Sequence, residues 1–324
     1  MYGTQSMSRC FDPTAERISY TFAYCLLSVV SLAGNSFIGI IVYRANTVRT
    51  PINILIVNMA ISDLLYPILF FTKRLTEINK ADHWLINGRL GQALCKLSIF
   101  ATDVSTLVSI QSLVLIAVDR FVAVVFPLRS PLISSKQYRF FILVIWIVAM
   151  AVYCPYLLAL KAIEYLEGLK CVLDWNDAFG ESFSPRGYFL GLAIVFIYVP
   201  LVLIAILYFA IALRIKSQKI PGEPSANARK QRLKRERNVL KMSVAVVLVF
   251  VVCWLPFSIR GVIHYFSSDS ALISSCGFQY YRTITDFLAH SYCAVNPCIC
   301  FIFNGNYRKE LKSFLTCFST NEAA

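Results

Sequence analysis

Long apolar stretches, separated by short polar links, dominate the chain. Four of these stretches contain no Asp, Glu, Lys or Arg: residues 18–43, 140–160, 187–213 and 242–259. Three more carry only isolated charges: residues 51–72, 97–126 and 283–303. Each is about long enough to cross a hydrocarbon core of ~30 Å as an α-helix, which satisfies its own backbone hydrogen bonds in lipid. The pattern therefore predicts seven membrane-spanning helices.

The spans also set the expected organisation of the chain. We expect an extracellular N-terminus (1–17), a seven-transmembrane helix bundle (18–303), an amphipathic interfacial helix (304–318) and a cytoplasmic tail (319–324). In 304–318, apolar residues recur at helical spacing beside basic residues, which is typical of a helix lying at the membrane surface. The predicted fold class is an all-α membrane protein, a seven-transmembrane helix bundle with a short amphipathic cytoplasmic helix after span seven.

Composition and charge narrow the class of protein further. Of the 324 residues, 57% are hydrophobic and 15% are charged, which is too little polar surface for soluble domains. The links after spans one, three, five and seven carry a net charge of +14, whereas the N-terminus and the other links carry +2. The positive-inside rule places the basic links in the cytoplasm. We therefore expect a multi-pass plasma-membrane protein with its N-terminus outside and no nucleic-acid partner.

Asp63 lies near the middle of the second span. A carboxylate there costs about 2.5–3.5 kcal/mol to insert, so its presence needs a reason. One interpretation is a structural aspartate held by hydrogen bonds, and the other is a buried ion or proton site. The candidate partners from other spans are Asn35, Ser109 and Asn296.

Charges and prolines mark the inner half and the middle of the bundle. Asp119 and Arg120 are adjacent at the inner end of span three, where such a pair could simply be exposed and weak. Pro256 and Pro297 lie inside spans six and seven. Because an interior proline removes a backbone hydrogen bond, both spans are predicted to bend, with Trp254 facing inward beside the first bend.

The specific signal is the combination of these residues with others, in order along the chain: Gly34-Asn35, Asp63, Cys95, Asp119-Arg120-Phe121, Trp146, Pro200, Tyr208, Cys253-Trp254-Leu255-Pro256 and Asn296-Pro297. This combination resembles the rhodopsin-like (class A) G-protein-coupled receptors, and most of all the neuropeptide-receptor group, over roughly residues 19–318. The resemblance implies a receptor and not an enzyme. It also implies an extracellular ligand, a heterotrimeric G protein, arrestin, a receptor kinase and membrane lipid as partners.

The resemblance assigns activation and coupling roles to seven residues: Asp119, Arg120, Tyr208, Trp254, Pro256, Asn296 and Pro297. Arg120 would pair with Asp119 at rest and contact the G protein or Tyr208 in the active state. Two positions depart from the family pattern. Phe121 replaces the tyrosine that usually follows the arginine, and Cys300 replaces a tyrosine at the inner end of span seven. These departures predict altered basal activity or coupling efficiency.

The resemblance also implies roles for cysteines. Cys95 would form a disulfide bond with Cys171, tying the long outer link to span three. Cys10 and Cys276 would either form a second disulfide bond or remain free thiols. Cys317, at the end of the amphipathic helix beside basic residues, resembles a palmitoylation site.

A sodium site is the one ionic site that the resemblance suggests. Asp63, Ser109 and Asn296 match the residues that hold sodium in the family, whereas Tyr292 and Cys293 replace smaller polar ligands. We therefore expect no cofactor, apart from a sodium ion as a possible allosteric ligand. The sequence contains no residue spacing typical of a metal centre or of a catalytic group.

Candidate ligand-binding residues lie in the outer half of the bundle: Arg74, Thr102, Asp103, Trp254, Phe257, His264, Arg282, Asp286 and His290. Thr102 occupies the position of the aspartate of amine receptors, and His290 that of the retinal-binding lysine, so the resemblance argues against both ligands. The mixed charge favours a peptide whose Arg or amidated end meets Asp103 or Asp286. Alternatively, opposite charges such as Arg74 and Asp286 pair with each other and take no part in ligand binding.

Two other functions stay open at this point. A seven-helix proton pump or transporter could use Asp63, Asp103, Asp286 and His290 as a relay. A receptor of this kind could also take a non-peptide small molecule. Agonist-stimulated nucleotide exchange on a G protein would favour a receptor, whereas ligand-independent ion flux in liposomes would favour a transporter.

Overall fold

The computed structural model describes residues 13–45, 50–79, 83–126, 135–165, 168–217, 226–267 and 270–321. Within these ranges, seven helical segments are long and apolar enough to cross a membrane. The predicted number of spans is therefore confirmed, and so is the predicted fold class.

Five spans are single helices, and the second and fifth are each made of three consecutive segments. In chain order, the spans are α1 (Pro13–Arg44); α2 (Pro51–Asp63), η2 (Tyr66–Phe71) and α3 (Thr72–Asn79); α4 (Gly88–Val125); α5 (Ser135–Ala159); α7 (Pro185–Ala193), η3 (Ile194–Tyr198) and α8 (Val199–Ser217); α9 (Ala226–Phe266); and α11 (Cys276–Phe303). The remaining elements are β1 (Leu160–Tyr165), β2 (Gly168–Leu173), α6 (Trp175–Phe179), α10 (Ser270–Ser274) and α12 (Gly305–Asn321).

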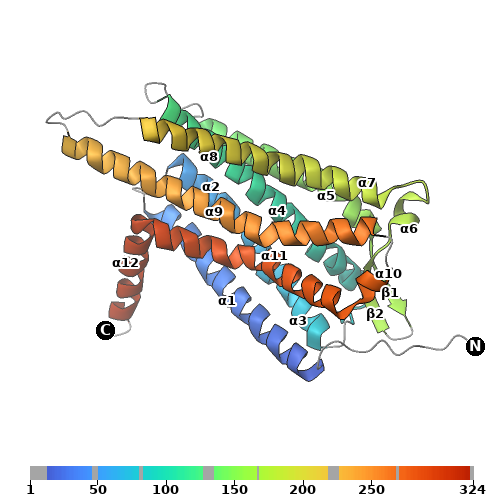
Figure 1. The fold of residues 1–324 in the computed structure, drawn as a ribbon. Coiled ribbons are helices and arrows are strands. Elements are labelled where there is room, and N and C mark those ends of the chain that lie inside the picture. The colour runs from blue at the N-terminus through green and yellow to red at the C-terminus, as the bar shows by residue number, and fades with distance from the viewer. Residues whose placement is uncertain are drawn as a thin grey trace, which may run out of the picture.

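The spans run side by side as one elongated bundle (Figure 1). The two strands, α6 and α10 gather at one end of it, whereas α12 turns away from α11 at the other end. By the positive-inside rule, the link charges predict that the strand end is the outer end and the α12 end the inner end, and the two ends are called outer and inner in this sense. The outer and inner candidate residues thus belong to opposite ends of the bundle.

The second span contains a π-helical segment that the sequence analysis did not predict. η2 includes Pro67, which lacks a backbone N–H and so cannot continue regular α-helical hydrogen bonding. The hydroxyl group of Thr72 donates to the backbone oxygens of Pro67 and Ile68, both at 3.1 Å. A local side chain therefore supplies a donor where lipid offers none.

The long outer link forms a β-hairpin, also unpredicted, in which β1 and β2 are antiparallel and Leu160 lies opposite Leu173. Gly168 adopts a φ of +128°, and a Cβ atom there would lie 2.4 Å from the ring of His83. The backbone N–H of Trp84 donates to the Leu169 oxygen at 2.6 Å. The link after span two thus packs tightly against the hairpin.

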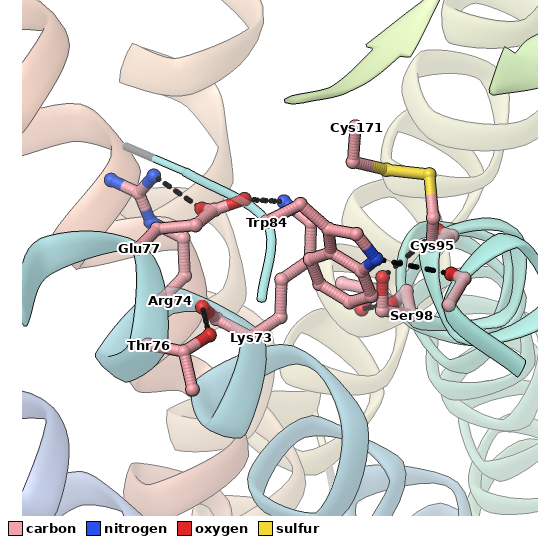
Figure 2. A network of polar contacts seen from close by, with 10 residues as sticks. Lys73, Arg74, Thr76, Glu77, Trp84, Cys95, Ser98 and Cys171 are labelled. Carbon is pink, nitrogen blue, oxygen red and sulfur yellow. Dashed lines mark hydrogen bonds and ion pairs between the residues drawn. A yellow bond between two sulfur atoms is a disulfide. The ribbon is translucent and has the colours of Figure 1, made fainter. Parts of the chain in front are cut away.

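The expected disulfide bond between Cys95 and Cys171 is confirmed, and it joins α4 to β2 with a Cα–Cα distance of 5.7 Å (Figure 2). Cys276, at the start of α11, is also disulfide-bonded. Cys10 lies outside the described residues, and so does the side chain of Cys317. Their pairing and lipidation stay predictions.

The outside of the bundle is apolar, as a lipid-facing surface must be. On α1, Ile18, Phe22, Leu26 and Val29 are 53–71% exposed and recur every three or four residues, so they form one stripe along the helix. Water would penalise such a stripe, whereas hydrocarbon does not.

Polar side chains inside the bundle tie three spans together. The indole N–H of Trp146 on α5 donates to the side-chain oxygen of Asn58 on α2 at 2.8 Å. The amide group of Asn58 in turn donates to the hydroxyl oxygen of Ser112 on α4 at 3.0 Å. Each group thereby gains the partner that an apolar interior would otherwise deny it.

Spans one and seven touch at Gly34. A Cβ atom at this position would lie 2.7 Å from Cγ of Pro297. We expect Gly34→Ala to lower the melting temperature of the detergent-solubilised protein, because overpacking typically costs about 1–3 kcal/mol. Gly39→Ala on the same helix is the matched control, since a Cβ atom there meets nothing within 4 Å. Equal melting temperatures for both variants would show that the close contact is unimportant.

Candidate functional site

Asp63 is fully buried at the centre of the bundle and is held by two other spans. Ser109 on α4 donates to Oδ1 at 3.3 Å, and Asn296 on α11 donates to Oδ2 at 3.0 Å. Asn35, the third expected partner, instead donates to the backbone oxygens of Ser31 and Cys293. These contacts agree with the structural interpretation of Asp63, and of the three candidate partners only Ser109 and Asn296 bond to it.

The residues next to Asp63 on α11 are large or weakly polar. Tyr292 is buried and packs edge-on against Phe250 at a ring distance of 5.0 Å. Cys293 is buried as well, and its thiol donates to the backbone oxygen of His290. Among the described residues, no group of three or more His, Cys, Asp or Glu side chains could hold a metal ion.

Asp119 and Arg120 form a half-buried ion pair at the inner end of α4. Arg120 donates to Oδ2 of Asp119 through Nε at 3.1 Å and through Nη2 at 2.5 Å. This is the resting arrangement that the resemblance implied, and it is not the weak exposed pair. Tyr208 on α8 makes no hydrogen bond to Arg120 in this arrangement.

Tyr138, on the inner turn of α5, completes the environment of Asp119. Its hydroxyl group donates to Oδ1 of Asp119 at 2.5 Å, so both carboxylate oxygens are occupied. Sequence reasoning missed this residue. The available signal was helical spacing, because Tyr138, Ile145 and Ala149 recur on one face and all three are buried.

The middle of α9 carries a buried aromatic cluster. Trp254 stacks on Phe250 at 5.9 Å and meets Phe257 edge-on at 5.3 Å. Tyr281 on α11 donates to the backbone oxygen of Pro256 at 2.9 Å. The inward position predicted for Trp254 is confirmed, and α11 supports α9 at its interior proline.

Ion pairs occupy the outer ends of spans two, six and seven. Lys73 and Arg74 both pair with Glu77, at 2.5 and 3.1 Å (Figure 2). Asp286 on α11 pairs with Arg260 on α9 at 2.7 Å and with Arg282 at 3.9 Å. The pair suggested between Arg74 and Asp286 is therefore wrong, because each residue has a nearer partner of its own.

Asp103 differs from these paired acids. It is half-buried on α4, and among the described residues it has neither a hydrogen-bond donor nor a cationic partner. It interacts electrostatically with Tyr153 on α5 and Tyr188 on α7. Its neighbour Thr102 is buried and donates to the backbone oxygen of Ser98 at 2.7 Å. Asp103 is thus a carboxyl group without a hydrogen-bond or ionic partner among the described residues, in the outer half of the bundle.

Aromatic rings lie beside the ion pairs. His290 is buried and stacks on Phe70 at 4.1 Å, and the guanidinium group of Arg260 lies 4.6 Å above the ring of Phe257. By contrast, His264 is exposed at the end of α9, and the side chain of Arg282 is 65% exposed. The structure therefore brings Trp254, Phe257 and His290 together beside the Arg260–Asp286 pair. Thr102 and Asp103 have separate surroundings on α4, and His264 and Arg282 lie at the rim.

Comparison of the sequence with known protein families identifies the class of this protein. Residues 34–299 match the family described as 7 transmembrane receptor (rhodopsin family), and the chain belongs to that family. It is therefore a multi-pass plasma-membrane G-protein-coupled receptor and not an enzyme. Membership of this family does not favour the transporter alternative.

The chain is also similar in sequence to two receptors of known type. The chain is 29% identical over 310 residues to the QRFP-like peptide receptor of Branchiostoma floridae, covering 94% of this chain and 79% of that receptor. It is 28% identical over 295 residues to the RYamide receptor of Drosophila melanogaster, covering 88% of this chain and 60% of that receptor. The chain thus spans less than two thirds of the second relative.

We expect Tyr138→Phe to raise the basal rate of nucleotide exchange about threefold to tenfold. The substitution removes the hydroxyl group that donates to Asp119, and hydrogen bonds to charged groups contribute about 1.5–3 kcal/mol. The measurement is binding of a non-hydrolysable GTP analogue to G protein in membranes containing equal amounts of receptor. Tyr198→Phe is the control, because no hydrogen bond of the Tyr198 hydroxyl occurs among the described residues. An unchanged basal rate would show that Tyr138 has no part in the resting state.

Proposed function

We propose that this receptor binds an extracellular peptide in the outer half of the bundle and activates a heterotrimeric G protein at the inner end. One relative is named as a QRFP-like peptide receptor and the other as an RYamide receptor. The observation that carries the proposal is Asp103, a half-buried carboxylate without a cationic partner among the described residues. A basic group of a peptide would neutralise it.

Of the two acids considered for this contact, Asp103 is the better candidate. Asp286 already shares its carboxylate between Arg260 and Arg282. A cationic ligand group approaching Asp286 would meet these two arginines, whereas at Asp103 it meets the tyrosines Tyr153 and Tyr188. An aromatic side chain of the peptide would then pack toward Phe257 and Trp254.

At the inner end, we propose that activation frees Arg120 from Asp119 so that it contacts the G protein or Tyr208. Arrestin and a receptor kinase would use the same face after activation. The basic links and the α12 helix would lie against anionic lipid, with Cys317 as a lipid anchor. In this orientation the N-terminus is extracellular, which the charge difference between the two sets of links supports.

Sodium binding at Asp63 is a secondary proposal. Ser109 and Asn296 supply polar groups beside the carboxylate. The bulk of Tyr292 argues for weaker binding than a site with small polar residues would have. Titration of agonist affinity with sodium chloride against choline chloride measures this effect directly.

The proposed function is tested by screening a neuropeptide library against membranes that contain the full chain and added G protein. Nucleotide exchange is the readout. Activation by at least one peptide supports the proposal. A response to non-peptide compounds alone, or exchange that no compound changes, would overturn it.

We expect Asp103→Asn to weaken a basic peptide agonist by more than about tenfold, which corresponds to about 1.4 kcal/mol. The substitution keeps the size of the side chain and removes its charge. The measurement is the agonist concentration for half-maximal nucleotide exchange. Glu181→Gln makes the same charge change at an exposed outer position and is expected to leave this concentration within about threefold of the original. Equal effects of the two variants would remove Asp103 from the binding site.

A further inference from the structure

In the ion pairs at the outer ends of α3, α9 and α11, cations outnumber carboxylates. Lys73 and Arg74 share Glu77, and Arg260 and Arg282 share Asp286. Each carboxylate is thus divided between two cations. These six side chains together carry a surplus of two positive charges.

The surplus is partly removed from water. The side chain of Lys73 is only 8% exposed and that of Arg260 only 17%. The Nε–H group of Arg260 is buried and has no hydrogen-bond acceptor among the described residues. Charges in such a setting are screened much less than on a surface, so an uncompensated surplus costs free energy.

The surplus positive charge is concentrated around one residue, His290. His290, buried on α11, stacks on Phe70 of the second span at 4.1 Å and lies 6.5 Å from the ring of Phe257 on α9. Lys73 and Arg74 follow Phe70 within about one helical turn, and the guanidinium group of Arg260 lies 4.6 Å above the ring of Phe257. Two of these cations come from the second span and one from the sixth. A group entering above His290 would therefore meet positive charge from both sides.

Besides the acids of the outer link, Glu16 and Asp103 lie on the outer parts of α1 and α4. Glu16, on the first turn of α1, interacts with Tyr20. Asp103 interacts with Tyr66, Tyr153 and Tyr188. Tyr66 also lies beside His290, at a ring distance of 6.0 Å, so among the described residues the binding region has a negative side at Asp103 and a positive side around His290.

We infer that the ligand of this receptor carries a carboxylate, which binds between Arg74 and Arg260, in addition to the basic group that binds Asp103. This inference rests on the proposed function, because it specifies the chemistry of the proposed peptide. The carboxylate would complement the surplus positive charge and give Arg260 an additional acceptor. It could be the free C-terminus of the peptide or an Asp or Glu side chain.

The test uses each activating peptide of the library in matched forms. One pair differs by a C-terminal carboxylate against an amide, and the other by Asp or Glu against Asn or Gln. We expect at least one of these neutralising changes to raise the half-maximal concentration about tenfold or more on the unmodified receptor. The form that loses potency identifies the source of the carboxylate.

Variants then locate the contact. Arg74→Gln and the double variant Arg260→Gln/Asp286→Asn are each expected to reduce the potency difference within a matched pair to less than about threefold. The double variant removes both members of the ion pair, so it leaves no unpaired buried charge. Arg89→Gln, an exposed cation on the outer turn of α4, is the control and should keep the full difference. Cell-surface receptor is quantified for every variant.

The outcomes separate the two proposals. Peptides that activate equally well in charged and neutral forms would overturn the carboxylate inference and leave the peptide receptor intact. A tenfold preference that survives in all variants would overturn the site between Arg74 and Arg260. A library without any activating peptide would overturn the proposed function, and the inference with it.

Discussion

Lipid offers no hydrogen-bond partner, and this single constraint organises the molecule. A polar side chain inside the bundle gains from a partner on another span or on its own helix, because leaving it unpaired costs several kcal/mol. Asp63 is consequently held by Ser109 and Asn296, which fixes the second span against the third and seventh. The contacts that remove the penalty for burying these groups also set the positions of the helices.

The same constraint distinguishes the two ends of the bundle. At the inner end, both oxygens of Asp119 are occupied, by Arg120 and Tyr138, so this acid has nothing left to offer a ligand. At the outer end, Asp103 has an unused charge, and the cations around His290 exceed the carboxylates that they share. A satisfied group stabilises the state in which it is found, whereas an unsatisfied group gains from binding something else. This contrast supports the proposal that the inner contacts stabilise the resting state and that the outer end binds the ligand.

The sequence allowed the spans, the bond between Cys95 and Cys171 and the pairing of Asp119 with Arg120 to be predicted. These features depend on composition or on neighbours along a recognised pattern. The hairpin, the π-helical segment at Pro67 and the bond from Tyr138 depend on how helices are rotated against each other, which periodicity constrains only loosely. The partner of Asp286 could not be predicted either, because several opposite charges lie at the same end of the bundle. The structure shows that Arg260, and not Arg74, pairs with Asp286.

The choice of Arg260 as the partner of Asp286 links the outer charges to the bends below them. The ion pair joins α9 to α11 one turn outside Pro256, and Tyr281 joins the same helices at the carbonyl group of that proline. An interior proline leaves its helix without one backbone hydrogen bond, so the two halves of α9 can move relative to each other more easily there than elsewhere. A ligand group that competes for Arg260 would therefore act on the outer half of α9, directly above the stacked rings of Trp254 and Phe250. Since α9 runs from this contact to the opposite end of the bundle, a ligand that binds Arg260, as we propose, would act on a helix that connects the two ends.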